Sequence, residues 1–78
     1  MRLADAIKCR IIEICEKENI TLNKACTQAG INHSTVASFF AGKTAMLRTD
    51  TIYYLCIGFK MTLAEFYSSP LFDNIDDD

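Results

Sequence analysis

Two glycines twelve residues apart, Gly30 and Gly42, bracket the stretch GINHSTVASFFAGK. Each follows a short segment whose apolar residues recur at steps of three and four, the spacing of one helical face. Glycine is favoured directly after a helix, because the chain there takes a left-handed conformation that is costly for a residue with a Cβ atom. The pair therefore predicts two short helices in succession, about 22–29 and 33–41, joined by three residues.

Apolar periodicity predicts three further helices, at about 3–17, 50–59 and 62–67. Thr21, Asn32 and either Thr49 or Asp50 are expected to cap helix starts, and Thr62 with Glu65 has capping-box spacing. No segment alternates as a strand does. The expected fold is an all-α, five-helix domain over residues 1–68, followed by a solvated acidic tail, 69–78, that ends in the run 76–78.

A connection of only three residues forces the two central helices to cross steeply, as in a helix-turn-helix. Such a turn requires a small residue one turn before the glycine, an apolar residue after it and a branched residue on the inner face of the second helix. Cys26, Ile31 and Val36 occupy these positions. The polar face of the second helix is then expected to point outward.

The distribution of charge fits an outward-facing surface of this kind. The chain has a formal net charge of -2, yet residues 19–49 contain Lys24, Lys43 and Arg48 and no acid. Affinity for nucleic acid depends on the charge of the face presented to phosphates rather than on the total. An acid-free segment of this length also arises by chance, so charge alone does not decide the function.

The segments ITLNKACTQAGINHSTVASFFAGK and RTDTIYYLCIGFKMTLAEFY follow a recognisable order of capping threonine, short helix, glycine, polar helix and Gly-Lys. In this order, residues 19–67 resemble the Cro/lambda-repressor-like helix-turn-helix family, often called Xre. The resemblance implies a bacterial or phage transcriptional regulator that binds double-stranded DNA in sequence-specific fashion and lays its recognition helix, the second of the central pair, in the major groove.

The resemblance also implies which residues would contact DNA. Base edges would be reached from the start of the recognition helix by Asn32, His33, Ser34, Thr35 and Ser38. Phosphates would be contacted by Thr21, Asn23, Lys24, Lys43, Thr44 and Arg48. Ser and Thr hydroxyls both donate and accept hydrogen bonds, so modest discrimination between bases is expected, with a larger share from DNA shape.

Several other classes are not indicated by the sequence. No apolar run approaches the roughly 18 residues of a membrane span, and charges interrupt the N-terminal segment, so a cytoplasmic protein is expected. The four cysteines (Cys9, Cys15, Cys26 and Cys56) lack metal-site or disulfide spacing and read as reduced, buried thiols. We expect no enzyme activity, no cofactor and no metal.

The resemblance implies a homodimer, whose interface is expected at the fifth helix and the tail: Leu63, Phe66, Tyr67, Leu71, Phe72 and Ile75. Two alternatives remain open at this point. One is a protein-interaction module, antitoxin-like, that binds a regulatory protein partner and has weak DNA affinity. The other is a thiol or metal sensor that uses Cys9, Cys15 or Cys26 with His33.

Overall fold

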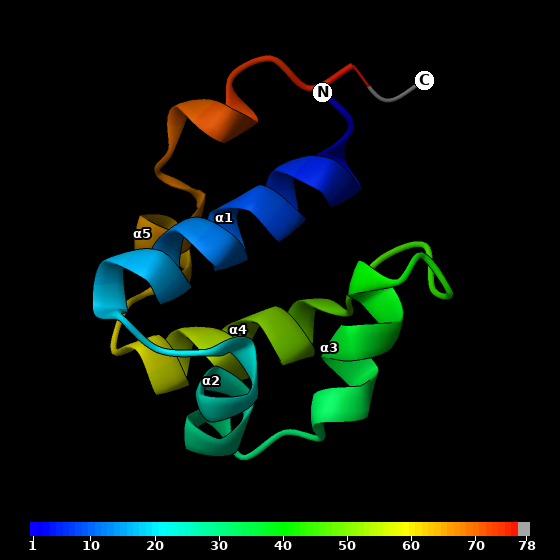
Figure 1. Ribbon diagram of the computed structural model, residues 1–78. Helices are drawn as coiled ribbons and strands as arrows, with labels where there is room; N and C mark the ends of the chain where they lie inside the picture. Colours follow the sequence, from blue (N-terminus) through cyan, green and yellow to red (C-terminus); the bar gives the residue numbers. More distant parts are fainter. Residues whose placement is uncertain (77–78) are drawn as a thin grey trace.

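A computed structural model describes residues 1–76 of the 78-residue chain (Figure 1). Its helices are α1 (Leu3–Glu18), α2 (Leu22–Ala29), α3 (His33–Phe40), α4 (Thr49–Phe59) and α5 (Leu63–Tyr67), followed by a 3-10 turn, η1 (Pro70–Phe72). Residues 1–76 contain no strand, so the predicted all-α class with five α-helices is confirmed. None of these helices is both long and apolar enough to cross a membrane.

Gly30 and Gly42 end their helices as predicted. Both have a positive φ, 71° and 79°. The N–H of Gly30 donates to the carbonyl of Thr27 and the next N–H, that of Ile31, donates to Cys26; Gly42 and Lys43 repeat this pattern after α3. These paired bonds satisfy carbonyls that the helix leaves without partners. Each glycine therefore redirects the chain at a fixed angle.

Most of the predicted helix starts are also correct. The Thr21 Oγ1 accepts a hydrogen bond from the Lys24 N–H at 3.1 Å, and Thr62 and Glu65 form the full capping box. The start of α4 differs from the prediction, because the residue preceding the helix is Arg48, which makes no side-chain cap. The Asp50 carboxylate lies inside the first turn and accepts from the adjacent Thr51 N–H at 2.8 Å.

The core lies where α1, α2, α3 and α4 meet. Val36 and Phe39 of α3 are fully buried, which fixes the side of α3 that faces inward. Cys15, Cys26 and Cys56 are buried in the same cluster, while Cys9 is partly exposed. The other buried members of this cluster are Ile7, Ile11, Ile14, Ala25, Leu47, Ile52, Leu55, Phe59 and Phe66.

The most extensive contact between helices joins α2 to α4, which lie next to each other in Figure 1. A Cβ atom added at Gly58 of α4 would lie 2.9 Å from the backbone nitrogen of Ala29 and 3.1 Å from its Cα. Backbone atoms cannot rotate out of the way as the end of a long side chain can. Glycine is therefore required at position 58 for α4 to seat against the end of α2.

We expect Gly58→Ala to destabilise the domain by about 1 to 2 kcal/mol, because overpacking outweighs the roughly 1 kcal/mol by which alanine favours a helix. Thermal and urea unfolding measure the change. Gly42→Ala is the matched control, because a Cβ atom added there has no neighbour within 4 Å. Its expected loss of stability, about 1 kcal/mol, reflects the positive φ alone. A more stable Gly58→Ala variant would contradict the tight contact.

The chain after α5 folds back against α1 rather than fraying, as far as Asp76. η1 packs on α1, the Asp76 N–H donates to the Met1 carbonyl at 3.1 Å, and the Asp76 carboxylate pairs with the Met1 ammonium at 2.9 Å. This part of the tail is therefore folded against α1, while its polar residues Asp73, Asn74 and Asp76 are exposed to solvent, as expected. The rest of the predicted acidic run, Asp77 and Asp78, lies outside the described residues.

Phe66 is fully buried, so its predicted place in a dimer interface was wrong. Its ring contacts the rings of Tyr67 and Phe72, with centroids 5.0 and 6.2 Å away. These three aromatic rings pack against one another within their own domain. Leu63, Leu71, Phe72 and Ile75 are partly buried, and Tyr67 is 37% exposed.

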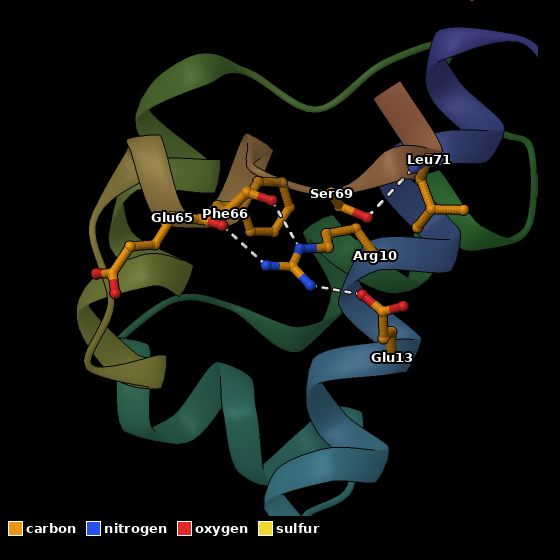
Figure 2. A network of polar contacts seen from close by, with 6 residues as sticks. All are labelled: Arg10, Glu13, Glu65, Phe66, Ser69 and Leu71. Atoms are coloured by element: carbon orange, nitrogen blue, oxygen red, sulfur yellow. Dashed lines mark hydrogen bonds and ion pairs between the residues drawn. The ribbon is translucent and has the colours of Figure 1, made fainter. Parts of the chain in front are cut away.

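Arg10 of α1 holds the end of α5 (Figure 2). Its Nε donates to the Phe66 carbonyl at 2.6 Å and its Nη2 donates to the Glu65 carbonyl at 2.8 Å. Its Nη1 pairs with Glu13 on the same helix. The Glu65 carbonyl also accepts a hydrogen bond from the Ser68 N–H at 3.2 Å, so the guanidinium adds a charged donor at the end of a helix of only five residues.

Arg10→Leu is expected to destabilise the domain by about 1 to 3 kcal/mol, because two carbonyls lose charged donors, one of them in a partly buried position. Chemical denaturation followed by circular dichroism measures the loss. Lys17→Leu, on the exposed last turn of the same helix, is the control and should change stability by less than about 0.5 kcal/mol. Equal effects of the two variants would show that the α5 contacts contribute little.

Candidate nucleic-acid interface

The outer face of α3 follows from its buried face. Because Val36 and Phe39 point into the core, the residues at the start of the helix point outward: Asn32, His33, Ser34 and Thr35 are exposed, and Ser38 is partly buried. This placement agrees with the orientation predicted from the turn. In Figure 1 the helix lies at one end of the molecule, with its first turn and the following loop uncovered by other elements.

The cap at the start of α3 limits what two of these side chains can do. The Asn32 Oδ1 accepts hydrogen bonds from both the N–H of Ser34, at 3.0 Å, and its hydroxyl, at 2.9 Å. The acceptor of Asn32 and the proton of Ser34 are thus already engaged. The His33 and Thr35 side chains are also exposed and make no hydrogen bond within residues 1–76.

A hollow of about 360 Å³ lies between α3, the loop after it and the first turn of α4. Five side chains predicted to contact DNA line this one hollow: Ser34, Thr35, Ser38, Thr44 and Arg48. The structure therefore brings residues predicted for base contact together with residues predicted for phosphate contact. Met46, which is 40% exposed, and Thr51 also line it, and sequence reasoning missed both.

A second hollow, of about 310 Å³, lies on the other side of the same loop. Thr44 lines both hollows, and the second is also lined by Arg2, which directly precedes α1, and by Lys8 of α1. The Lys8 ammonium lies 5.1 Å from the centre of the Phe39 ring, which ties it to α3. These two cations were not predicted, because nothing in the sequence indicates that α1 begins beside a loop some forty residues later.

The acid-free segment of the sequence is not an acid-free surface. Arg48 Nε lies 3.3 Å from the carboxylate of Asp50, which follows the segment directly. Asp5 lines the second hollow beside Arg2 and Lys8. The cationic surface around α3 is therefore partly neutralised from its edges, and Lys43, exposed at the tip of the loop, makes no ion pair within residues 1–76.

The start of α2 contributes separately. Thr21, Asn23 and Lys24 are exposed there, and Thr21 is engaged as the cap. None of the three lines either hollow beside α3. The predicted phosphate contacts thus fall into two groups, one at the start of α2 and one along the loop 41–48.

Three of the four thiols belong to the core rather than to this face. Burial raises the pKa of the Cys15, Cys26 and Cys56 thiols above the ordinary value of 9.0. Raised values disfavour the thiolate, which is the reactive and metal-binding form. Within residues 1–76, no three His, Cys, Asp or Glu side chains lie close enough together to hold a metal ion.

Alkylation of the native protein at pH 8 is therefore expected to modify one thiol per chain readily, that of Cys9, and the other three only after unfolding. Intact mass measured over time reports the count. Cys9→Ser should remove the early modification. Rapid labelling of three or four thiols in the native state would contradict the buried assignment.

The raised thiol pKa values also predict how stability changes with pH. The native state keeps these protons while the unfolded chain releases them near pH 9. The stabilisation is present below pH 9 and is lost as the pH rises through the raised pKa values. Urea unfolding between pH 7 and 10.5 should show this decline, and a flat profile in that range would contradict it.

The fold and this face together define a small all-helical domain that exposes a short polar helix beside a cationic loop. The crystal structure of the prophage Lp1 protein 11 is similar to it, with a TM-score of 0.83 and 25% sequence identity over 96% of this chain and 100% of that chain. The likeness extends from α1 into the tail. No protein-family model matches the chain, and no curated protein is similar to it in sequence.

Proposed function

We propose that the protein binds double-stranded DNA as a small phage or bacterial transcriptional regulator of the helix-turn-helix, Xre-like type. The observation that carries the proposal is the hollow in which Ser34, Thr35 and Ser38 of α3 meet Thr44 and Arg48. Base-reading and phosphate-binding side chains must lie on one surface for a helix to dock in a groove. The similarity to a prophage protein agrees with such a role.

In this proposal α2 and α3 form the helix-turn-helix and α3 enters the major groove. His33 and Thr35 face base edges, since both side chains are exposed and make no hydrogen bond within residues 1–76. The Thr35 methyl group and the exposed Met46 suit the 5-methyl group of thymine. Thr21, Asn23 and Lys24 contact one stretch of phosphates, and Lys43, Thr44 and Arg48 contact another.

The proposal needs no cofactor or metal and no catalytic residue. Its partners are double-stranded DNA and a second copy of the chain, in the cytoplasm of the cell that carries it. Two copies would place their α3 helices on successive major grooves, about 34 Å apart. Short hydroxyl side chains discriminate bases weakly, so the pair of half-sites supplies much of the selectivity.

Selection of bound sites from random DNA, followed by titration at 50 and 200 mM salt, tests the proposal. We expect a selected site with two related halves and a slope of log affinity against log salt of about -3 per copy. Failure to retain any DNA, or a flat response to salt, would refute DNA binding. Retention of DNA without any preferred site would refute sequence-specific recognition.

Two substitutions separate the two kinds of contact. Arg48→Ala should weaken binding to selected and unrelated DNA alike and reduce the salt slope by about 1 per copy. Thr35→Ala should weaken binding to the selected site by about 1 kcal/mol, with little effect on unrelated DNA. Lys17→Ala is the control, because Lys17 lies on the last turn of α1, at the end away from α3 in Figure 1. If Lys17→Ala lowered the DNA affinity as much as Arg48→Ala, the effect of Arg48 would reflect the total charge of the protein rather than a specific contact.

A protein-interaction module is the second candidate function. The observation that favours it is the exposure of Tyr53, Tyr54 and Ile57 on α4. Recovery of one defined partner protein, under conditions in which the selected DNA is ignored, would support this alternative over DNA binding.

A further inference from the structure

The outer face of α4 carries apolar surface that no part of residues 1–76 covers. Tyr53, Tyr54 and Ile57 are 46%, 46% and 52% exposed. The two tyrosine rings contact each other, with centroids 5.8 Å apart. Among the exposed large hydrophobic side chains, these three are the ones that gather on a single helix.

This face is distinct from the face by which α4 joins its own domain. Ile52, Leu55, Cys56 and Phe59 are buried on the inner side. Asp50, Tyr53 and Ile57 are separated by three and four residues and therefore share the opposite side, with Tyr54 beside them. The outer face thus forms one continuous strip along the helix.

The two ends of the strip have opposite charges. Asp50, which also lies 3.3 Å from the Arg48 Nε of its own chain, is exposed in the first turn of α4, and Lys60 is exposed directly after its last residue. Tyr53, Tyr54 and Ile57 occupy the length between them. A strip that is acidic at one end, apolar in the middle and basic at the other end can match a copy of itself.

We propose that a second copy of this chain covers the strip, with the two α4 helices antiparallel about a two-fold axis near the level of Leu55. Two-fold pairing brings the same patch of both copies together. In the antiparallel arrangement Asp50 faces Lys60 of the second copy, and Tyr53 faces Ile57. A parallel pairing would instead place like charges opposite each other and align the two helix dipoles unfavourably.

The inference rests on the proposed function in one respect, the use of two copies on DNA, and it replaces the interface expected at α5. Three apolar side chains from each copy bury less apolar area than the interface of a permanent dimer does. Pairing should therefore be weak in free solution. Two adjacent half-sites would raise the effective concentration of one copy near the other. Assembly on DNA would then require little interface area.

Sedimentation equilibrium without DNA, at chain concentrations from roughly 10 μM to 1 mM, tests the pairing where weak dimers are detectable. We expect a concentration-dependent dimer. Ile57→Asp should weaken it at least about tenfold, because a charge replaces the apolar centre. Ile12→Asp is the matched control, since Ile12 is 47% exposed on α1 and should leave the dimer unchanged.

A charge exchange tests the antiparallel register. Asp50→Lys and Lys60→Asp should each form weaker homodimers, because each variant opposes like charges. An equimolar mixture of the two should form a heterodimer in which both charge pairs are restored. Aspartate is tolerated in the left-handed conformation of residue 60, where φ is 61°, and thermal unfolding confirms that both variants fold.

A chain that stays monomeric at 1 mM, or a dimer unaffected by Ile57→Asp, would overturn the inference. Homodimers of the two charge variants that are as stable as their mixture would overturn the register. Because these measurements contain no DNA, they are independent of the outcome of the site selection. A monomer that still binds a selected site would refute the interface while leaving the proposed function standing.

Discussion

The contact between Ala29 of α2 and Gly58 of α4 sets the geometry of the rest of the domain. The backbones of Ala29 and Gly58 are so close that a Cβ atom at position 58 would not fit. The last turn of α2 therefore packs directly against the backbone of α4. Gly30 follows directly and turns the chain with a fixed left-handed conformation. The direction of α3 is therefore set by two backbone constraints one residue apart. A rigid scaffold of this kind is what a recognition surface built from short side chains requires, because such side chains cannot compensate for a misplaced helix.

The same constraint explains why α4 can serve two surfaces. Its inner side is occupied by the core and by the end of α2, and its first turn lines the hollow beside α3. Its outer side, with Tyr53 and Ile57, then faces solvent. Asp50 stands where these surfaces meet, paired with Arg48 of its own chain. Any charge change at this position acts on both the cationic loop and the proposed pairing, so electrostatics at the start of α4 couples the two.

Local signals in the sequence predicted local structure well, and contacts between distant residues were the part that could not be predicted. The helix ends at Gly30 and Gly42, the cap at Thr21 and the capping box at Thr62 depend on neighbouring residues alone, and all are present. The Arg10 contacts with the end of α5 and the approach of α1 to the loop join residues far apart in sequence. Phe66 was misassigned for the same reason: its periodicity on a five-residue helix does not reveal that η1 and α1 close over it.

For the candidate site, sequence reasoning chose the correct exposed face of α3 but overestimated its positive charge. The positive charge was judged from the acid-free segment 19–49, but Asp50 and Asp5, which lie outside this segment, are close to it in space. Their negative charges lower the potential of the surface around α3. The partly neutralised surface and the commitment of Asn32 and Ser34 to the helix cap both reduce what one copy can gain from DNA. A single domain of this kind would therefore bind weakly and select poorly. The proposed pairing through α4 would address both weaknesses at once, because two modest half-site preferences would multiply and the second copy would bind from a high effective concentration.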